Sequence, residues 1–439
     1  MTSLPINQPQ PQTEVGNYFI SNYPPFSFWK PEHVDQAEAA LQRSPDPTTP
    51  LGLYLHIPFC RKRCKFCYFR VYTDKNASEV EVYLDALVRE IALYSELPVM
   101  RERPFRFAYF GGGTPSFISD KQLRSLIDRL RQHISWDDAE EVTFECEPGT
   151  LSRHKVEAIR EIGVTRLSLG IEHFDDEILE ANGRAHLSKE VYLAWDWITD
   201  VGFPQVNIDL IAGMVGETDD KWHDAVKRTV DLLPDSVTIY QMELPYNTTY
   251  SQDILSGGQS PVAGWQQKRD WVAYAFDQLA SAGYEQSSAY TMVRKTPHSG
   301  FVYRDSLWRG ADMIGAGVAS FSHVGGVHFQ NLDQFDDYVR ALRGGRLPIS
   351  RALTLEPAEL LIREMILQIK TGRLDAGYFR DKFGAEILTE FAEAFGKHAA
   401  AGMLTISGDT ITLTPAGLLQ ADSLLPEFFL ERHRDARYT

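Results

Sequence analysis

The stretch Leu53-Tyr-Leu-His-Ile-Pro-Phe-Cys60-Arg-Lys-Arg-Cys64-Lys-Phe-Cys67 places three of the chain's four cysteines on one short loop, directly after an apolar run typical of a strand. A disulfide framework would spread its cysteines along the chain, so clustered thiols indicate metal or redox chemistry. Three thiolates can hold three corners of a four-iron, four-sulfur cluster and leave the fourth iron without a protein ligand. The loop is also basic, which favours thiolates and an anionic cluster.

A structural zinc site is the alternative interpretation of this loop. Zinc in such sites takes four protein ligands, and His56 or Cys146 would have to complete the set. Cys146 lies on a separate predicted strand, far along the chain. We therefore predict a 4Fe–4S cluster whose metal ligands are Cys60, Cys64 and Cys67.

Short β-rich runs alternate with helical patterns from residue 51 onward. The runs lie at residues 53–57, 106–110, 142–146, 166–170, 206–211 and 237–240. Six strand–helix units in a row predict an α/β fold with parallel strands and right-handed crossovers. Six units fall short of the eight of a closed barrel, so a partial barrel and an open doubly wound sheet both fit. In either fold, function is expected at the carboxyl ends of the strands.

Composition divides the chain into three predicted parts. Residues 1–50 are rich in proline and contain an aromatic segment, so we interpret them as an arm that docks on the body. Residues 51–345 form the predicted barrel. Residues 346–439 show two helical patterns, the second at 383–398, and a hairpin with Gly408-Asp409 at its turn, which is similar to a winged-helix module. Acidic residues outnumber basic ones by 13 to 10 over residues 351–439, which argues against DNA binding by this module.

The overall charge and hydropathy exclude some functions. The formal net charge of −16 argues against a general nucleic-acid binder, because phosphate contacts need clustered Lys and Arg. No apolar run is long enough to span a membrane, and the N-terminus lacks the pattern of a signal peptide. We expect a cytoplasmic monomer that acts on a small molecule.

A glycine-rich segment, Phe110-Gly-Gly-Gly-Thr-Pro115, follows the second predicted strand. Consecutive glycines let the backbone approach a ligand closely. Together with the Cys-x3-Cys-x2-Cys loop, this segment resembles the radical S-adenosylmethionine superfamily, whose fold is a partial barrel of six strand–helix units. The resemblance implies that the open iron binds S-adenosylmethionine and splits it into a 5′-deoxyadenosyl radical. It also places Phe66 beside the adenine and Gly112, Gly113 and Thr114 at the methionine amino group.

Further matches, from about residue 51 to the C-terminus, resemble the oxygen-independent coproporphyrinogen III oxidase family. The matching segments are Tyr54-Leu-His-Ile-Pro-Phe-Cys60, Phe144-Glu-Cys-Glu-Pro148, Arg166-Leu-Ser-Leu-Gly-Ile-Glu-His-Phe174, Asn182-Gly-Arg-Ala-His186 and Asn207-Ile-Asp-Leu-Ile211. The resemblance assigns ribose contacts to Glu145 and Glu172, although the family usually has Gln at the latter position. It assigns the methionine carboxylate to Arg184. Three further residues are assigned to the same cofactor pocket: Tyr54, Asp209 and Met242.

The resemblance leaves the substrate open. Tyr18-Phe-Ile-Ser-Asn-Tyr-Pro24 looks like the family's arm, which reaches the substrate, so we assign substrate contacts to Tyr18 and Tyr23. Trp308 and Phe321 are assigned to the substrate as aromatics that could line a pocket for a flat molecule, although aromatic residues lie in cores more often than in pockets. We also expect removal of residues 1–30 to leave the fold intact and to lower turnover. The catalytic residues are not assigned.

Two departures from the family pattern keep three activities open. Phe69 stands where the oxidases have a further Cys, and Tyr303-Arg-Asp-Ser-Leu-Trp-Arg-Gly310 replaces the segment near which the family binds a second S-adenosylmethionine. The candidates are a radical oxidase acting on a tetrapyrrole, a methyltransferase or cyclopropane-forming enzyme using a second S-adenosylmethionine, and a heme-binding chaperone. An electron donor such as flavodoxin or ferredoxin is implied.

Overall fold

The computed structural model describes residues 20, 22–245, 248–256, 262–296, 299–434 and 436. Its described part contains a twelve-stranded sheet in the order β12-β11-β10-β9-β1-β2-β3-β4-β5-β6-β8-β7. The six predicted strands lie side by side in chain order and run parallel, which confirms the α/β partial barrel. They are β1 (Leu51–Ile57), β2 (Phe105–Gly112), β3 (Glu141–Cys146), β4 (Arg166–Glu172), β5 (Gln205–Ala212) and β6 (Ser236–Gln241).

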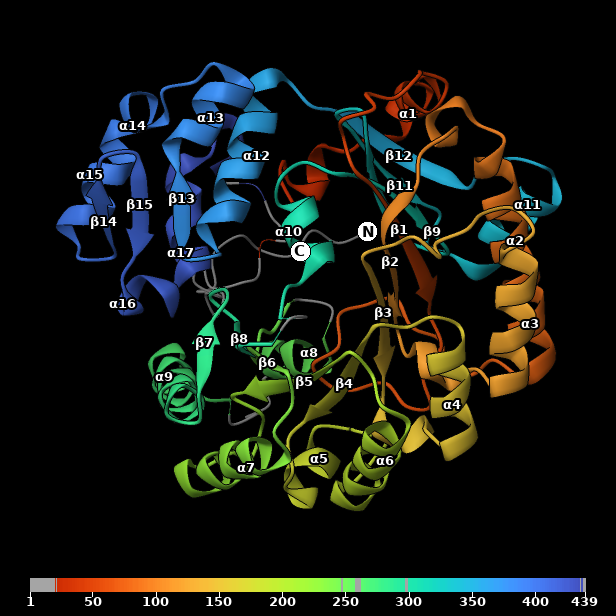
Figure 1. Ribbon diagram of the computed structural model, residues 1–439, viewed down its shortest axis with the longest axis horizontal. Coiled ribbons are helices and arrows are strands. Elements are labelled where there is room, and N and C mark those ends of the chain that lie inside the picture. The colour runs from red at the N-terminus through yellow and green to blue at the C-terminus, as the bar shows by residue number, and fades with distance from the viewer. Residues whose placement is uncertain are drawn as a thin grey trace.

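Helices cover the outer face of these parallel strands (Figure 1). They are α2 (Ala77–Ser95), α3 (Asp120–Leu130), α4 (Arg153–Glu161), α5 (Asp176–Ala181), α6 (Ser188–Val201), α7 (Asp219–Leu232) and α9 (Trp265–Ser281). Helix α3 begins at a capping box, where the Ser119 hydroxyl accepts the Gln122 N–H and the Gln122 side chain accepts the Ser119 N–H. None of the described helices is both long and apolar enough to cross a membrane.

Strand alternation decides which side chains face the interior of the barrel. On β4, Leu167, Leu169 and Ile171 are fully buried in the hydrophobic core. The intervening residues of β4 line a cavity inside the barrel; they are Arg166, Ser168, Gly170 and Glu172. Because successive side chains of a strand point to opposite faces, the same rule brings polar residues of β3, β5 and β6 into this interior.

The large sheet extends beyond the predicted strands at both ends. Strands β9 (Asp312–Ala316), β10 (Phe321–Val324), β11 (Val327–Asn331) and β12 (Ile349–Thr354) continue it past β1, and β8 (Thr291–Arg294) and β7 (Tyr284–Gln286) continue it past β6. Helices α8 (Thr249–Leu255), α10 (Val302–Leu307) and α11 (Phe335–Arg343) connect these parts. Since β12 pairs with β11, the sheet runs past the boundary predicted at residue 345.

The C-terminal part combines helices with a three-stranded sheet in the order β13-β15-β14. The predicted hairpin is present as β14 (Leu404–Ser407) and β15 (Thr410–Leu413), and β13 (Arg373–Asp375) pairs with it. The single helix predicted over residues 383–398 is wrong: α13 ends at Phe383, because the next residue, Gly384, has a φ of +67° outside the helical region, and two further helices follow. The helices are α12 (Pro357–Ile369), α13 (Ala376–Phe383), α14 (Ile387–Glu390), α15 (Ala392–Ala400), α16 (Pro415–Leu418), α17 (Ala421–Leu424) and α18 (Glu431–Arg434).

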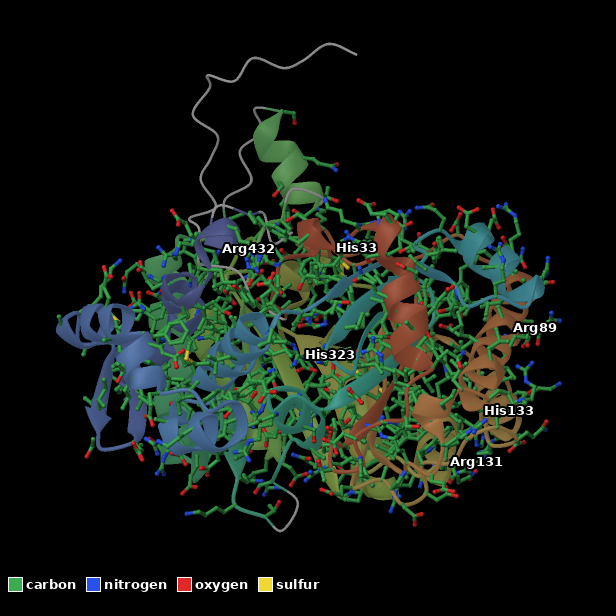
Figure 2. All side chains as sticks on the ribbon, turned by 90° about the horizontal axis from the view of Figure 1, so that it is seen from above. His33, Arg89, Arg131, His133, His323 and Arg432 are labelled. Carbon is green, nitrogen blue, oxygen red and sulfur yellow. The ribbon has the colours of Figure 1, made fainter. Side chains whose placement is uncertain are left out.

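The described part of the arm packs into the body and leads into α1 (Val34–Leu41). Ile20 and Tyr23 are buried in the core of the C-terminal part, and Trp29 stacks on His328 of β11. Figure 2 shows His323 inside the molecule; its Nδ1 lies 3.0 Å from that of His328, beneath Trp29. The expectation that the fold survives removal of residues 1–30 stays a prediction, and the burial of Ile20, Tyr23 and Trp29 argues against it.

Candidate cofactor site in the barrel interior

The three loop cysteines line a cavity of about 380 Å³ at the carboxyl ends of the parallel strands. The loop is fixed by its backbone: the Cys60 N–H donates to the Tyr72 carbonyl at 3.1 Å, and the Lys65 N–H donates to the Asn182 carbonyl at 3.0 Å. The sulfurs themselves are partly exposed toward the cavity. The loop thus presents three thiols to one space without pairing them as disulfides.

The arrangement of donors fits a cluster better than a single metal ion. Among the described residues, no three His, Cys, Asp or Glu side chains converge closely enough to bind one ion. His56, the proposed fourth zinc ligand, is buried beneath Gly112, and its Nδ1 lies 3.3 Å from the Tyr54 hydroxyl. A 4Fe–4S cluster needs each thiolate on a different iron, so it suits thiols that share a cavity wall without meeting at a point.

The glycine segment packs directly against the cysteine loop. A Cβ at Gly113 would lie 3.0 Å from the Cys60 sulfur and 2.9 Å from the Pro58 carbonyl carbon. Gly112 has a φ of +120°, where a side chain is strained. The next residue, Thr114, places its hydroxyl oxygen 3.3 Å from the Cys60 sulfur. These glycines are therefore required to seat the loop, in addition to any contact with a ligand.

Two half-buried acids face the cavity from β3 and β5. Glu145 accepts a hydrogen bond from the Tyr109 hydroxyl at 2.7 Å and one from the Gly112 N–H at 3.2 Å. Burial raises its pKa to about 7, although the Tyr109 hydrogen bond lowers it. Asp209 accepts from the Ser168 hydroxyl and from the Asn207 amide, and burial raises its pKa as well. Both carboxyl groups can accept hydrogen bonds from the hydroxyls of a ligand.

Glu172 reaches the cavity through a local distortion of β4. The register against β5 shifts between Gly170 and Glu172, and Glu172 has a φ of +67°, a strained value for a residue with a side chain. The bulge turns its carboxylate toward Arg184, whose guanidinium lies 3.6 Å away. Burial raises the pKa of Glu172 to about 7 against the opposing effect of Arg184.

Arg184 connects this acid to the cysteine loop. Its guanidinium donates to the Gly170 carbonyl at 2.8 Å and contacts the Cys64 sulfur at 3.4 Å. Its Nε is buried without a hydrogen-bond partner. A planar fork in this position can pair with a carboxylate beside the cysteines.

Two polar residues of this region escaped the sequence analysis. Glu147 accepts a hydrogen bond from Arg61 at 2.8 Å and lies near His186; burial raises its pKa, but His186, Arg184 and Arg61 together hold it well below the usual range. Arg166 lines the cavity with only 2% of its surface exposed. Alternation along β3 and β4 was the available signal, because Glu147 follows Glu145 by two residues and Arg166 precedes Ser168 by two.

The structure brings most of the predicted cofactor residues to one cavity. Its walls include Phe66, Gly112, Gly113, Thr114, Glu145, Glu172, Arg184, Asp209 and Met242, together with the three cysteines. Tyr54 is not in its lining; it stacks on Tyr109 behind the cavity wall. The aromatic Tyr240, on β6, does line the cavity.

The predicted substrate residues lie elsewhere. The Tyr23 hydroxyl contacts His433 at 2.8 Å in the C-terminal core. Trp308 is buried in the same core, and Phe321 stacks on Phe26 of the arm. None of these three lines the cysteine cavity, and Tyr18 lies outside the described residues.

Comparison with models of protein families identifies a relative of this site. The family model of the radical SAM superfamily matches residues 54–229, which include the cysteine loop and the glycine segment. This part of the chain is similar to the radical SAM superfamily. The cofactors of that superfamily are a 4Fe–4S cluster and S-adenosylmethionine, and the cysteine loop and cavity fit both.

Relatives with two different names match over most of the chain. The oxygen-independent coproporphyrinogen III oxidase of Pseudomonas aeruginosa is 29% identical and covers 88% of this chain and 86% of its own length. The heme chaperone HemW of Mycobacterium tuberculosis is also 29% identical, with 87% and 95% covered. The solved coproporphyrinogen III oxidase HemN of Escherichia coli shares the fold, with a TM-score of 0.81 at 24% identity over 93% of this chain and 96% of that one.

Proposed function

We propose that the protein is a radical S-adenosylmethionine enzyme of the coproporphyrinogen III oxidase type, acting on a tetrapyrrole or another large substrate. The observation that carries this proposal is the single cavity shared by three unpaired cysteines, Arg184 and the acids Glu145 and Asp209. When bound there, the cluster would supply the electron that splits S-adenosylmethionine into methionine and a 5′-deoxyadenosyl radical.

The chain's own residues would hold and orient the cofactor. Arg184 would pair with the methionine carboxylate, because its guanidinium already lies beside Cys64. The carboxyl groups of Glu145 and Glu172 would accept hydrogen bonds from the ribose hydroxyls. Phe66 and Met242, both in the cavity wall, would offer apolar surface to the adenine and limit the access of water.

A heme-chaperone function is the second candidate, and Phe69 favours it. This position follows the third cysteine by two residues, and Phe69 is exposed and contacts the Tyr68 ring at a tilt. By resemblance, the oxidases have a Cys at this position, whereas the chaperones and the family's methyltransferases do not. Relatives of both names match this chain at equal identity, so the reaction product must decide between the two functions.

The electron donor would dock at the cysteine loop. The loop carries an exposed basic cluster on a chain whose net charge is −16; its members are Arg61, Lys62, Arg63 and Lys65. A small acidic carrier such as flavodoxin or ferredoxin would be attracted to this cluster. The same loop holds the cysteines, so docking there would shorten the path to the cluster.

Product analysis tests the proposed function. The anaerobically reconstituted protein is incubated with S-adenosylmethionine, a reductant and coproporphyrinogen III, and the tetrapyrrole is analysed by mass spectrometry. The oxidase proposal predicts loss of CO2 together with formation of 5′-deoxyadenosine. Gain of CH2 would indicate a methyltransferase, whereas tight heme binding without any product would support the chaperone candidate.

A further inference from the structure

Arg166 carries a charge inside the barrel that no described residue pairs. It lies at the start of β4, is 2% exposed, and lines the cavity that holds the cysteines. Its Nε is buried without a hydrogen-bond partner. Within the described residues, the guanidinium lies over the Phe301 ring, and its central carbon is 4.1 Å from the ring centre. A buried guanidinium with unused donors is costly unless a partner arrives.

The acids around Arg166 do not form an ion pair with it among the described residues, and each is hydrogen-bonded to other donors. Glu141 accepts the N–H groups of Val302 and Tyr303 at 2.9 and 3.1 Å. Glu145 and Asp209 are hydrogen-bonded as described above. No salt bridge within 4 Å joins any of the three to Arg166 in the described part of the chain. These acids partly offset the positive charge of Arg166, but the N–H donors of its guanidinium remain available to a ligand.

Arg166 is also distinct from the arginine at the cysteine end. Arg184 bonds to the carbonyl of Gly170, four residues further along β4, which corresponds to roughly 13 Å at the usual rise of a strand. The cavity therefore has one cation beside the cysteines and a second deep in the barrel. S-adenosylmethionine has a single carboxylate, and the proposed function places it at Arg184.

We propose that Arg166 binds a carboxylate of the substrate in the depth of the barrel. This inference rests on the proposed function for the placement of S-adenosylmethionine. A carboxylate matches the planar fork of the guanidinium in a bidentate way. It brings one negative charge, whereas a phosphate would bring nearly two into a site that Glu141, Glu145 and Asp209 already make acidic. The substrate class is a molecule with a carboxylate side chain that reaches past the cofactor.

The first test compares a carboxylate substrate with its ester. Binding of coproporphyrinogen III and of its tetramethyl ester to the reconstituted holoprotein is measured anaerobically. Wild type should prefer the acid at least tenfold, and Arg166→Gln should lose this preference. Arg166→Lys, which keeps the charge and loses the fork, should retain part of it. Arg304→Gln is the matched control, because Arg304 also faces Phe301 but pairs with Asp305 and lies outside the cavity lining.

A second measurement separates this inference from the choice of substrate. Sodium propionate should raise the melting temperature of wild type and of Arg304→Gln, but not of Arg166→Gln, and inorganic phosphate should have a smaller effect than propionate. If wild type binds no tetrapyrrole but shows the Arg166-dependent propionate effect, the tetrapyrrole proposal fails and the carboxylate site stands. Equal propionate stabilisation of wild type and Arg166→Gln would overturn the inference. The inference would also be overturned if Arg166→Gln lost as much affinity for S-adenosylmethionine as for the carboxylate substrate, because Arg166 would then belong to the cofactor site.

Discussion

The barrel cavity and the contact between the arm and the C-terminal part both bury charged groups, but they treat those groups differently. At the arm contact, the fully buried Lys370 donates to the Ile20 carbonyl at 2.8 Å and lies 3.1 Å from Asp422. Asp422 also accepts the Ile20 N–H and the Tyr290 hydroxyl. In the cavity, the Nε atoms of Arg166 and Arg184 have no partner among the described residues. Near the arm, Arg363 is intermediate, because its Nε donates to Asn22 while one terminal nitrogen of its guanidinium has no partner in the described part of the chain. A charge that is satisfied by protein holds segments together, whereas one left open in a cavity is available to a ligand.

The largest effect is expected from substitution of the three cysteines that bind the cluster in the cavity. Cys60→Ala, Cys64→Ala or Cys67→Ala should each lose the cluster and all cleavage of S-adenosylmethionine, because each cysteine supplies one of three protein ligands. Iron content after anaerobic reconstitution and 5′-deoxyadenosine formation are the two measurements. Cys146→Ala is the matched control and should retain both, with about four irons per chain. Loss of the cluster in Cys146→Ala alone would refute the three-ligand site.

The packing of the arm against β10 and β11 of the large sheet should break at Trp29. This side chain is 2% exposed and packs on Phe26, Phe321 and His328. Trp29→Ala should lower the free energy of unfolding by about 3–5 kcal/mol, as is typical for removing a buried aromatic ring. Urea unfolding followed by circular dichroism measures the change. The exposed neighbour Ser27 offers a control, and Ser27→Ala should change stability little. A Trp29→Ala protein as stable as wild type would show that the arm does not hold the cores together.

Glu90 sharpens the comparison, because this buried acid, like Asp422 at the arm contact, is hydrogen-bonded to donors of the protein itself. It accepts hydrogen bonds from the Gly317 N–H at 2.8 Å, the Asn331 amide at 2.6 Å and the Tyr338 hydroxyl at 2.5 Å. Burial nevertheless raises its pKa from 4.5 to about 7. A raised pKa means that the folded state holds a proton that the unfolded state releases. The contribution to stability is therefore complete below pH 4.5 and is lost as the pH rises through 7.

Glu90→Gln should remove this pH dependence. Between pH 4.5 and 7.5, the free energy of unfolding of wild type should fall relative to that of Glu90→Gln by about 3 kcal/mol. Urea unfolding at several pH values gives the difference. Glu81→Gln, on the exposed face of the same helix, should keep the slope of wild type. Parallel pH profiles for wild type and Glu90→Gln would mean that Glu90 is already charged in the folded protein.

The smallest expected effect tests the fork of Arg184. Arg184→Lys should weaken S-adenosylmethionine binding by roughly 1–3 kcal/mol, because an ammonium cannot pair bidentately with a carboxylate. Equilibrium binding to the reconstituted protein measures the loss, and iron content should be unchanged. Arg153→Lys, in a surface ion pair with Asp200, is the control. Unaltered affinity in Arg184→Ala would place Arg184 among the structural ion pairs.

The sequence predicted the barrel and much of its cavity because both follow local rules. The parallel strands were visible as β-rich runs, and Glu145, Glu172 and Asp209 lie at or near the ends of three of them. Since parallel strands bring their carboxyl ends to one edge, residues at these positions had to meet. The cysteine loop could be predicted from the spacing of its three cysteines alone.

The positions that sequence reasoning misplaced depend on contacts across the chain. Tyr23 looked like a substrate residue, but its hydroxyl meets Leu430 and His433, about four hundred residues away. Trp308 packs in the same core. Arg166 was visible only as the first residue of a strand, and whether a guanidinium there is paired depends on neighbours from β3, β5 and the segment before α10. No local pattern contains that information.

The measurement that tests the central claim most directly is electron paramagnetic resonance of the reduced, reconstituted protein with and without S-adenosylmethionine. Three cysteine ligands imply one iron that is open to the cofactor. Wild type should give the signal of a reduced 4Fe–4S cluster, and its g values should shift when S-adenosylmethionine is added. Cys146→Ala should behave in the same way. A cluster signal that does not respond to saturating S-adenosylmethionine would contradict the assignment of this cavity.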